Sequence, residues 1–94
     1  MDFQKAPEIK SLRKKIDRLD LKTAALLLER FKIAGEIGRL KKKYGRAVLD
    51  AKREREILKR LASCGGGKYS SALLRVFKAV ISESRGMQKV RRKS

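Results

Sequence analysis

Apolar side chains recur at alternating steps of three and four residues through the first half of the chain. The series consists of Ile9, Leu12, Ile16, Leu19, Thr23, Leu26, Arg30, Ile33, Ile37, Leu40 and Tyr44. This spacing puts the side chains on one side of an α-helix, whereas a strand would show alternation at every second residue. The pattern predicts a single helix of roughly 35 residues, about 50 Å long at ~1.5 Å per residue.

A helix of this length cannot bury its apolar stripe inside one small chain, because a domain of 94 residues forms only a thin core on its own. A partner subunit would cover the stripe, so we expect an oligomer. The whole chain, residues 1–94, is expected to form one domain. We expect residues 1–7 and 91–94 to be disordered tails.

Glycines and one aspartate mark the ends of the predicted helices. Gly45 follows the long series as a C-cap, because glycine readily adopts the left-handed conformation that often ends a helix. After a short connection at 46–49, Asp50 is a suitable N-cap for a second helix. The apolar side of this helix consists of Ile57, Leu58 and Leu61. The glycine run at 65–67 is expected to end it.

A third helix is predicted after the glycine run, with Ser70 or Ser71 as its N-cap. Its stripe, in which polar residues continue the apolar spacing, consists of Leu74, Phe77, Ile81, Ser84 and Gln88. Arg30 occupies a similar place in the series of the first helix. Polar groups at core positions require hydrogen-bond partners. We therefore expect buried polar partners for Arg30, Ser84 and Gln88.

The chain is strongly basic, with 27 Lys+Arg against 10 Asp+Glu and a formal net charge of +17. A surface with this charge attracts polyanions or small anionic substrates, and the charge alone does not distinguish them. One alternative is therefore a basic helical protein that binds nucleic acid. Against it, aromatic residues make up only 5% of the chain, and no groove-reading motif or stacking platform is present.

Histidine is absent from the sequence, which excludes Ser-His-Asp and Cys-His catalysis and removes a common zinc ligand. Cys64 is the single cysteine, so the chain cannot form an internal disulfide. The longest apolar run, residues 24–28, is too short to span a bilayer, and the N-terminus lacks the apolar segment of a signal peptide. We expect a cytoplasmic protein without metal or cofactor, whose chemistry uses cations, carboxylates, amides and hydroxyls.

Four segments, in order along the chain, carry motifs of one known helical family. They are residues 12–20 (LRKKIDRLD), Glu29-Arg30 followed by Lys41, residues 48–50 (VLD) with 53–55 (RER), and residues 81–84 (ISES) with Gln88. Together they resemble the all-helical, class II chorismate mutases over about residues 8–90. The glycine run at 65–67 and the basic tail depart from the family pattern. The resemblance implies the conversion of chorismate to prephenate in aromatic amino acid (Phe/Tyr) biosynthesis.

The resemblance also implies a substrate site made of eight residues: Arg13, Arg30, Lys41, Asp50, Arg53, Glu54, Ser84 and Gln88. Arg13 and Arg30 would hold one substrate carboxylate, and Arg53 and Lys41 would lie near the other. Lys41 and Gln88 would donate to the ether oxygen, and Glu54 would accept a hydrogen bond from the ring hydroxyl. The Asp50 main chain and Ser84 would line the pocket. Lys41, Gln88, Arg30 and Glu54 are the expected catalytic residues.

Helix geometry bears on these roles. Arg30 and Lys41 are eleven residues apart, about 16 Å along the axis and on one face, so their long side chains can approach a small dianion from its two ends. Arg13 precedes Arg30 by seventeen residues, about 25 Å. It can reach the same ligand only from an antiparallel partner helix. The resemblance implies such a partner, in an intertwined antiparallel helical homodimer.

The implied reaction is a unimolecular rearrangement, which needs no nucleophile and no metal. Orientation of the substrate and donors at the ether oxygen would accelerate it. A related activity on the same architecture, isochorismate pyruvate-lyase, remains an alternative.

Taken alone, residues 41–43 are typical of a solvated helix end, and residues 53–55 are typical of an exposed helix face. For Lys41, its place on the same helix face as Arg30 favours a role in the substrate site over a solvated helix end.

Overall fold

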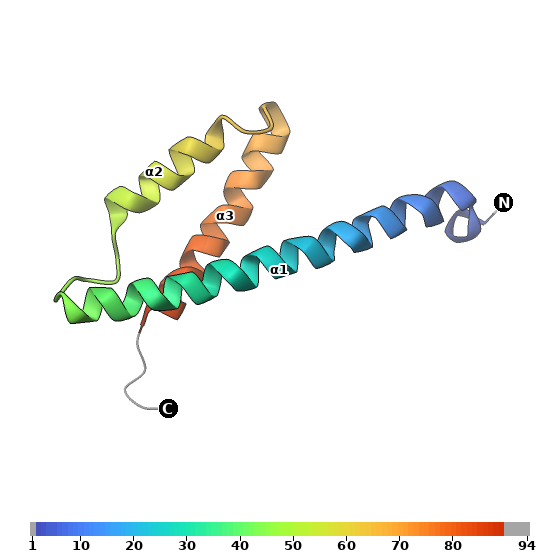
Figure 1. The fold of residues 1–94 in the computed structure, drawn as a ribbon. Coiled ribbons are helices and arrows are strands. Elements are labelled where there is room, and N and C mark those ends of the chain that lie inside the picture. The colour runs from blue at the N-terminus through green and yellow to red at the C-terminus, as the bar shows by residue number, and fades with distance from the viewer. Residues whose placement is uncertain (1, 90–94) are drawn as a thin grey trace.

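The computed structural model describes residues 2–89 and is built from helices (Figure 1). In chain order these are a short 3-10 helix η1 (Phe3–Lys5), α1 (Pro7–Lys43), α2 (Ala51–Ala62) and α3 (Gly67–Gln88). The predicted all-α class, with three α-helices and a long first one, is confirmed. Over the described residues, no helix has an apolar stretch of the length that crossing a membrane requires.

Helix α1 begins and ends with residues that suit its termini. Pro7 stands in the first turn, where its missing N–H group costs no intrahelical bond. The last turn carries three lysines, whose charge is favourable near the C-terminal end of the helix dipole. Gly45 follows with a φ of 66°, as expected for a residue just beyond a helix end.

Residues 2–7, which belong to the disordered tail expected at 1–7, have defined structure. Phe3–Lys5 form η1, and the side chain of Asp2 accepts a hydrogen bond from the Gln4 backbone N–H at 3.0 Å. Pro7 already belongs to α1. The other predicted tail, residues 91–94, lies outside the described residues.

Helix α2 begins as predicted, and α3 does not. The Asp50 side chain caps α2 by accepting a hydrogen bond from the Arg53 N–H at 3.0 Å. The prediction that Ser70 or Ser71 caps α3 is wrong, because Gly66 is the N-cap and the helix begins at Gly67. The Ser70 hydroxyl instead donates to the Ala62 carbonyl at 2.7 Å, which ties the end of α2 to the first turn of α3.

Helix α3 packs against both α1 and α2 (Figure 1). The buried residues of α3 are Val80, Ile81 and Ser84, and those of α1 are Ala34 and Gly38. At the crossing, a Cβ built on Gly38 would lie 2.1 Å from the Gln88 carbonyl oxygen. The two backbones therefore touch at this point, and only glycine permits this approach. The core of the chain lies at this crossing, toward the C-terminal ends of α1 and α3.

The N-terminal half of α1 projects away from the other helices (Figure 1). The molecule measures 62 × 35 × 15 Å and has a radius of gyration of 17.9 Å. A compact domain of this length would have a radius of gyration of about 12 Å. Along the projecting half, three apolar side chains of the predicted stripe are more than half exposed: Leu12, Ile16 and Leu19. Exposed apolar surface of this kind is typical of interaction sites.

Candidate active site

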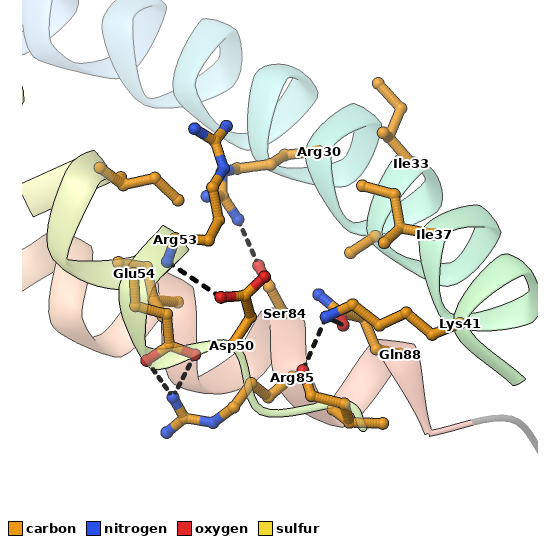
Figure 2. Close-up of a pocket in the computed structure, with 14 residues that line it drawn as sticks. Arg30, Ile33, Ile37, Lys41, Asp50, Arg53, Glu54, Ser84, Arg85 and Gln88 are labelled. Carbon is orange, nitrogen blue, oxygen red and sulfur yellow. Dashed lines mark hydrogen bonds and ion pairs between the residues drawn. The ribbon is translucent and has the colours of Figure 1, made fainter. Parts of the chain in front are cut away.

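A pocket of about 380 Å³ lies among the three α-helices (Figure 2). Its wall combines four cationic side chains, two carboxylates, a hydroxyl and an amide with an apolar part. The lining residues are Arg30, Ile33, Ala34, Ile37, Lys41, Val48, Asp50, Arg53, Glu54, Ile57, Ile81, Ser84, Arg85 and Gln88. The positive charges exceed the negative ones, so the pocket favours a small anion with an apolar body.

Arg30 is held by a serine on α3. Its Nη1 donates to the Ser84 hydroxyl oxygen at 2.5 Å, and the Ser84 hydroxyl donates to the Val80 carbonyl at 2.7 Å. Ser84 is only 4% exposed. The serine therefore has a polar partner, as the sequence pattern predicts, although Arg30 is only partly buried. The hydrogen bond fixes the direction of the Arg30 guanidinium group.

Lys41 joins the connection after α1 to the end of α3. Its ammonium group donates to the Val48 carbonyl and to Oε1 of Gln88, each at 2.7 Å. Because Oε1 of Gln88 accepts from Lys41, the amide NH2 group is the part of this side chain that can donate to a bound molecule. The ammonium group of Lys41 has a third N–H for the same purpose. Figure 2 shows the polar ends of the two side chains meeting at one end of the pocket.

The first turn of α2 brings Asp50 and Arg53 to the pocket. Capping by the Asp50 carboxylate fixes where this turn begins. The Arg53 side chain is 54% exposed, and its contact with Glu56 is long, with 3.9 Å between the nitrogen and the oxygen. An exposed contact of this kind contributes little stability. The Arg53 guanidinium group can therefore leave it to bind a ligand.

Arg85 is a pocket residue that the sequence analysis missed. Its Nη1 lies 2.7 Å from both carboxylate oxygens of Glu54, and the two side chains are 33% and 22% exposed. The sequence contains one indication that Arg85 belongs to the site. It directly follows Ser84 and lies three residues before Gln88, and both of these are predicted site residues. It lies off the apolar stripe of α3, however. Only the packing of α3 against α2 shows that this second side of the helix also faces the pocket.

Arg13 is the predicted site residue that does not line the pocket of its own chain. It lies on the projecting half of α1, where its guanidinium group donates to the side-chain oxygen of Gln4 and stacks over the Phe3 ring at 5.7 Å. Helix α1 is unbroken between Arg13 and Arg30, so the two remain about 25 Å apart along the axis. The other seven predicted residues line the pocket.

These groups define a class of site. Fixed guanidinium and ammonium groups bind carboxylates, and amide and ammonium N–H groups donate to a further oxygen. Among residues 2–89, no three Cys, Asp or Glu side chains converge to hold a metal ion. The fold and the pocket thus define a helical domain whose cationic site suits a small carboxylate-bearing molecule.

Residues 12–89 match the family described as chorismate mutase type II, and the chain belongs to this family. It is 41% identical over 76 residues, or 79% of its length, to the bifunctional chorismate mutase/prephenate dehydratase of Escherichia coli. It is 32% identical over 74 residues to the intracellular chorismate mutase of Mycobacterium tuberculosis, covering 79% of this chain and 70% of that one. The match covers 20% of the length of the bifunctional relative.

A solved structure of chorismate mutase (form II) from Thermus thermophilus is similar in fold. It aligns with a TM-score of 0.82 and 32% identity, covering 93% of this chain and 98% of that one. A conserved hypothetical protein from Pyrococcus furiosus aligns with a TM-score of 0.75 and 31% identity, covering 88% and 97% of the two chains. The three-helix fold is therefore shared along nearly the whole length of both structures.

Proposed function

We propose that this chain catalyses the rearrangement of chorismate to prephenate. The observation that carries the proposal is the convergence of Arg30, Lys41, Arg53 and Gln88 on one pocket, in a chain of the chorismate mutase type II family. Relatives from Escherichia coli and Mycobacterium tuberculosis bear the name chorismate mutase, which supports it. The substrate carries two carboxylates, which fits a pocket with an excess of positive charge.

The reaction breaks the C–O bond of the ether and forms a C–C bond within one molecule, so no atom enters or leaves. Negative charge develops on the ether oxygen as the C–O bond breaks. The free N–H groups of Lys41 and Gln88 are suited to meet this oxygen, because both side chains are already fixed by their mutual hydrogen bond. Donors that are in place before the reaction need no reorganisation when the charge appears.

The substrate carboxylates are assigned to the guanidinium groups. Arg30, held by Ser84, would bind one carboxylate together with Arg13 of a second copy, and Arg53 would bind the other, near Lys41. Glu54 would accept a hydrogen bond from the ring hydroxyl. With both ends of the molecule held, the side chain of the substrate lies over its ring, an orientation that removes much of the entropic barrier.

A homodimer completes the proposed site. The exposed apolar stripe on the projecting half of α1 needs a partner, and Arg13 lies on the same half. In an antiparallel pair of α1 helices, each Arg13 would approach the Arg30 of the other chain. The dimer would therefore bury the stripe and close two equivalent pockets.

We further propose that the protein acts in the cytoplasm, in the biosynthesis of aromatic amino acids. The name of the Mycobacterium tuberculosis relative, an intracellular chorismate mutase, supports an intracellular location. The proposed substrate and product belong to that biosynthetic route. Cell fractionation with an antibody against the chain tests the location, and recovery in the membrane or secreted fraction would contradict it.

The test of the proposed function is incubation of the purified chain with chorismate, followed by product identification by NMR. We expect prephenate, with the same composition as the substrate and no added cofactor. Release of pyruvate from isochorismate, without prephenate formation, would instead indicate a lyase of the same fold. Tight, salt-sensitive DNA binding without turnover of chorismate would indicate the nucleic-acid alternative.

A further inference from the structure

Arg85 and Glu54 form an ion pair that links α3 to α2 at the wall of the pocket (Figure 2). One nitrogen, Nη1 of Arg85, lies 2.7 Å from both Oε1 and Oε2 of Glu54. With exposed fractions of 33% and 22%, the side chains are screened by water less than a surface pair. The pair therefore fixes the direction of the Glu54 carboxylate.

The last turns of α3 carry three side chains that each hold a pocket group of another helix. Ser84 accepts a hydrogen bond from Arg30, and Gln88 accepts one from Lys41. Arg85 lies between them in sequence and acts in the same way on Glu54 of α2. One helical segment thus orients groups from both α1 and α2, and Arg85 is the member of this set that faces α2.

The charge of the pocket gives Arg85 a second effect. Glu54 brings a carboxylate into a cavity that is proposed to receive a doubly negative molecule, and like charges repel each other. A guanidinium group at 2.7 Å offsets this repulsion. Each carboxylate oxygen has two acceptor sites, so Glu54 can bind Arg85 and still accept a hydrogen bond from a hydroxyl group.

We propose that Arg85 is a positioning residue for substrate recognition, which aims the Glu54 carboxylate at the ring hydroxyl and cancels its repulsion of the substrate carboxylates. This inference rests on the proposed function. The hydroxyl and the carboxylates are present in both the substrate and the transition state. Arg85 therefore acts on binding, and its loss raises KM more than it lowers kcat.

The first test is Arg85→Met, which keeps an apolar stem and removes the cation. We expect KM to rise roughly ten- to a hundredfold, as for loss of a charged hydrogen bond, while kcat changes less than about threefold. Arg85→Lys keeps a cation and recovers most of the loss. The control Arg55→Met removes the same charge from an exposed site on α2 outside the pocket lining, and is expected to behave like wild type.

A purely structural role gives a different result, because a partly unfolded preparation has a lower kcat and an unchanged KM. The Glu54→Gln background distinguishes an effect of Arg85 through Glu54 from direct contact between Arg85 and the substrate. If Arg85 acts through Glu54, adding Arg85→Met to Glu54→Gln changes KM by less than about threefold. An equal rise in KM in both backgrounds would overturn the proposal, since Arg85 would then contact the substrate itself. A wild-type KM for Arg85→Met would overturn it as well.

Crystal structures without substrate keep the test independent of activity. We expect the Glu54 carboxylate to point into the pocket in the wild-type protein and to lose this direction in the Arg85→Met variant. The same direction in both structures would overturn the positioning role of Arg85. If the wild-type protein leaves chorismate unchanged, the proposed function fails, while the two crystal structures still decide the role of Arg85.

Discussion

At the scale of single residues, the proposed catalysis depends on polar groups that are held in place before a ligand arrives. Lys41 shows this best, since two of its three N–H groups are engaged by the protein, one by Val48 and one by Gln88. The third N–H and the Gln88 amide group are directed by these contacts. Fixed donors of this kind contribute most to the rate when they face an atom whose charge grows in the transition state.

The alanine variants Lys41→Ala and Gln88→Ala test this assignment. Each is expected to lower kcat by roughly a hundred- to a thousandfold, equivalent to about 2.7–4 kcal/mol of barrier, because each removes one donor to the ether oxygen. Helix content, measured by circular dichroism, should stay near that of wild type. The matched control Lys42→Ala removes an exposed neighbour outside the pocket lining and should keep full activity. Wild-type turnover in either pocket variant would contradict the assignment.

Much of the pocket could be predicted at this scale. Arg30, Ser84 and Gln88 are polar residues at apolar positions, and two of them, Arg30 and Ser84, bind each other. Arg85 is harder to predict, because it lies off the stripe and the sequence gives only its position beside Ser84 as a signal. Periodicity identifies the main buried side of a helix, whereas a second side that packs on a third helix follows only from the tertiary arrangement.

At the scale of the helices, the crossing of α1 and α3 sets the geometry of the pocket. Gly38 allows the α1 backbone to lie against the backbone of Gln88. The side chain of Gln88 then reaches Lys41 at 2.7 Å. A change at Gly38 should therefore affect both the stability of the crossing and the position of a proposed catalytic residue.

The variant Gly38→Ala tests the crossing. Its Cβ would lie 2.1 Å from the Gln88 carbonyl oxygen, so the helices must separate, at a cost of about 1–3 kcal/mol for overpacking. We expect a lower melting temperature and a lower kcat. The matched control is Gly86→Ala, whose Cβ meets nothing within 4 Å and which should be neutral or stabilising by up to about 1 kcal/mol. Equal melting temperatures and rates for the two variants would contradict the close crossing.

The helix ends show why some boundaries could be predicted and one could not. Asp50 and Gly45 occupy the expected ends because each residue type has a specific role there, a capping carboxylate and a left-handed φ. Ser70 suggested a later start for α3 by the same rule. The glycine at position 66, with φ 61°, turns the chain earlier, and Ser70 is left to bind the Ala62 carbonyl. Two competing start signals within five residues cannot be ranked from sequence alone.

At the scale of the whole molecule, the long helix and the small core indicate assembly. The length of α1 and its apolar spacing predicted a stripe that one chain cannot bury, and the structure leaves Leu12, Ile16 and Leu19 more than half exposed. The proposed dimer itself stays a prediction. Sequence could indicate that a partner is needed, but the geometry of the pairing depends on contacts between two chains.

Two lysine substitutions, two residues apart, test the proposed interface. Leu19→Lys places a charge in the apolar stripe and is expected to shift the protein to a monomer with little activity, measured by sedimentation and by the chorismate assay. Leu21→Lys places the same charge on the other side of α1, at a position that is 74% exposed, and should leave the assembly intact. An active, well-folded monomer from Leu19→Lys would contradict the need for two chains.

In the proposed dimer each pocket combines Arg13 of one chain with Lys41 of the other, and mixing two inactive variants tests this shared site. Arg13→Ala and Lys41→Ala are each purified, shown to be nearly inactive, and then unfolded and refolded together in equal amounts. If Arg13 acts across the interface, every mixed dimer regains one intact site, and the mixture recovers about a quarter of wild-type activity. If the mixture stays as inactive as its parents while mixed dimers are present, the shared site is contradicted.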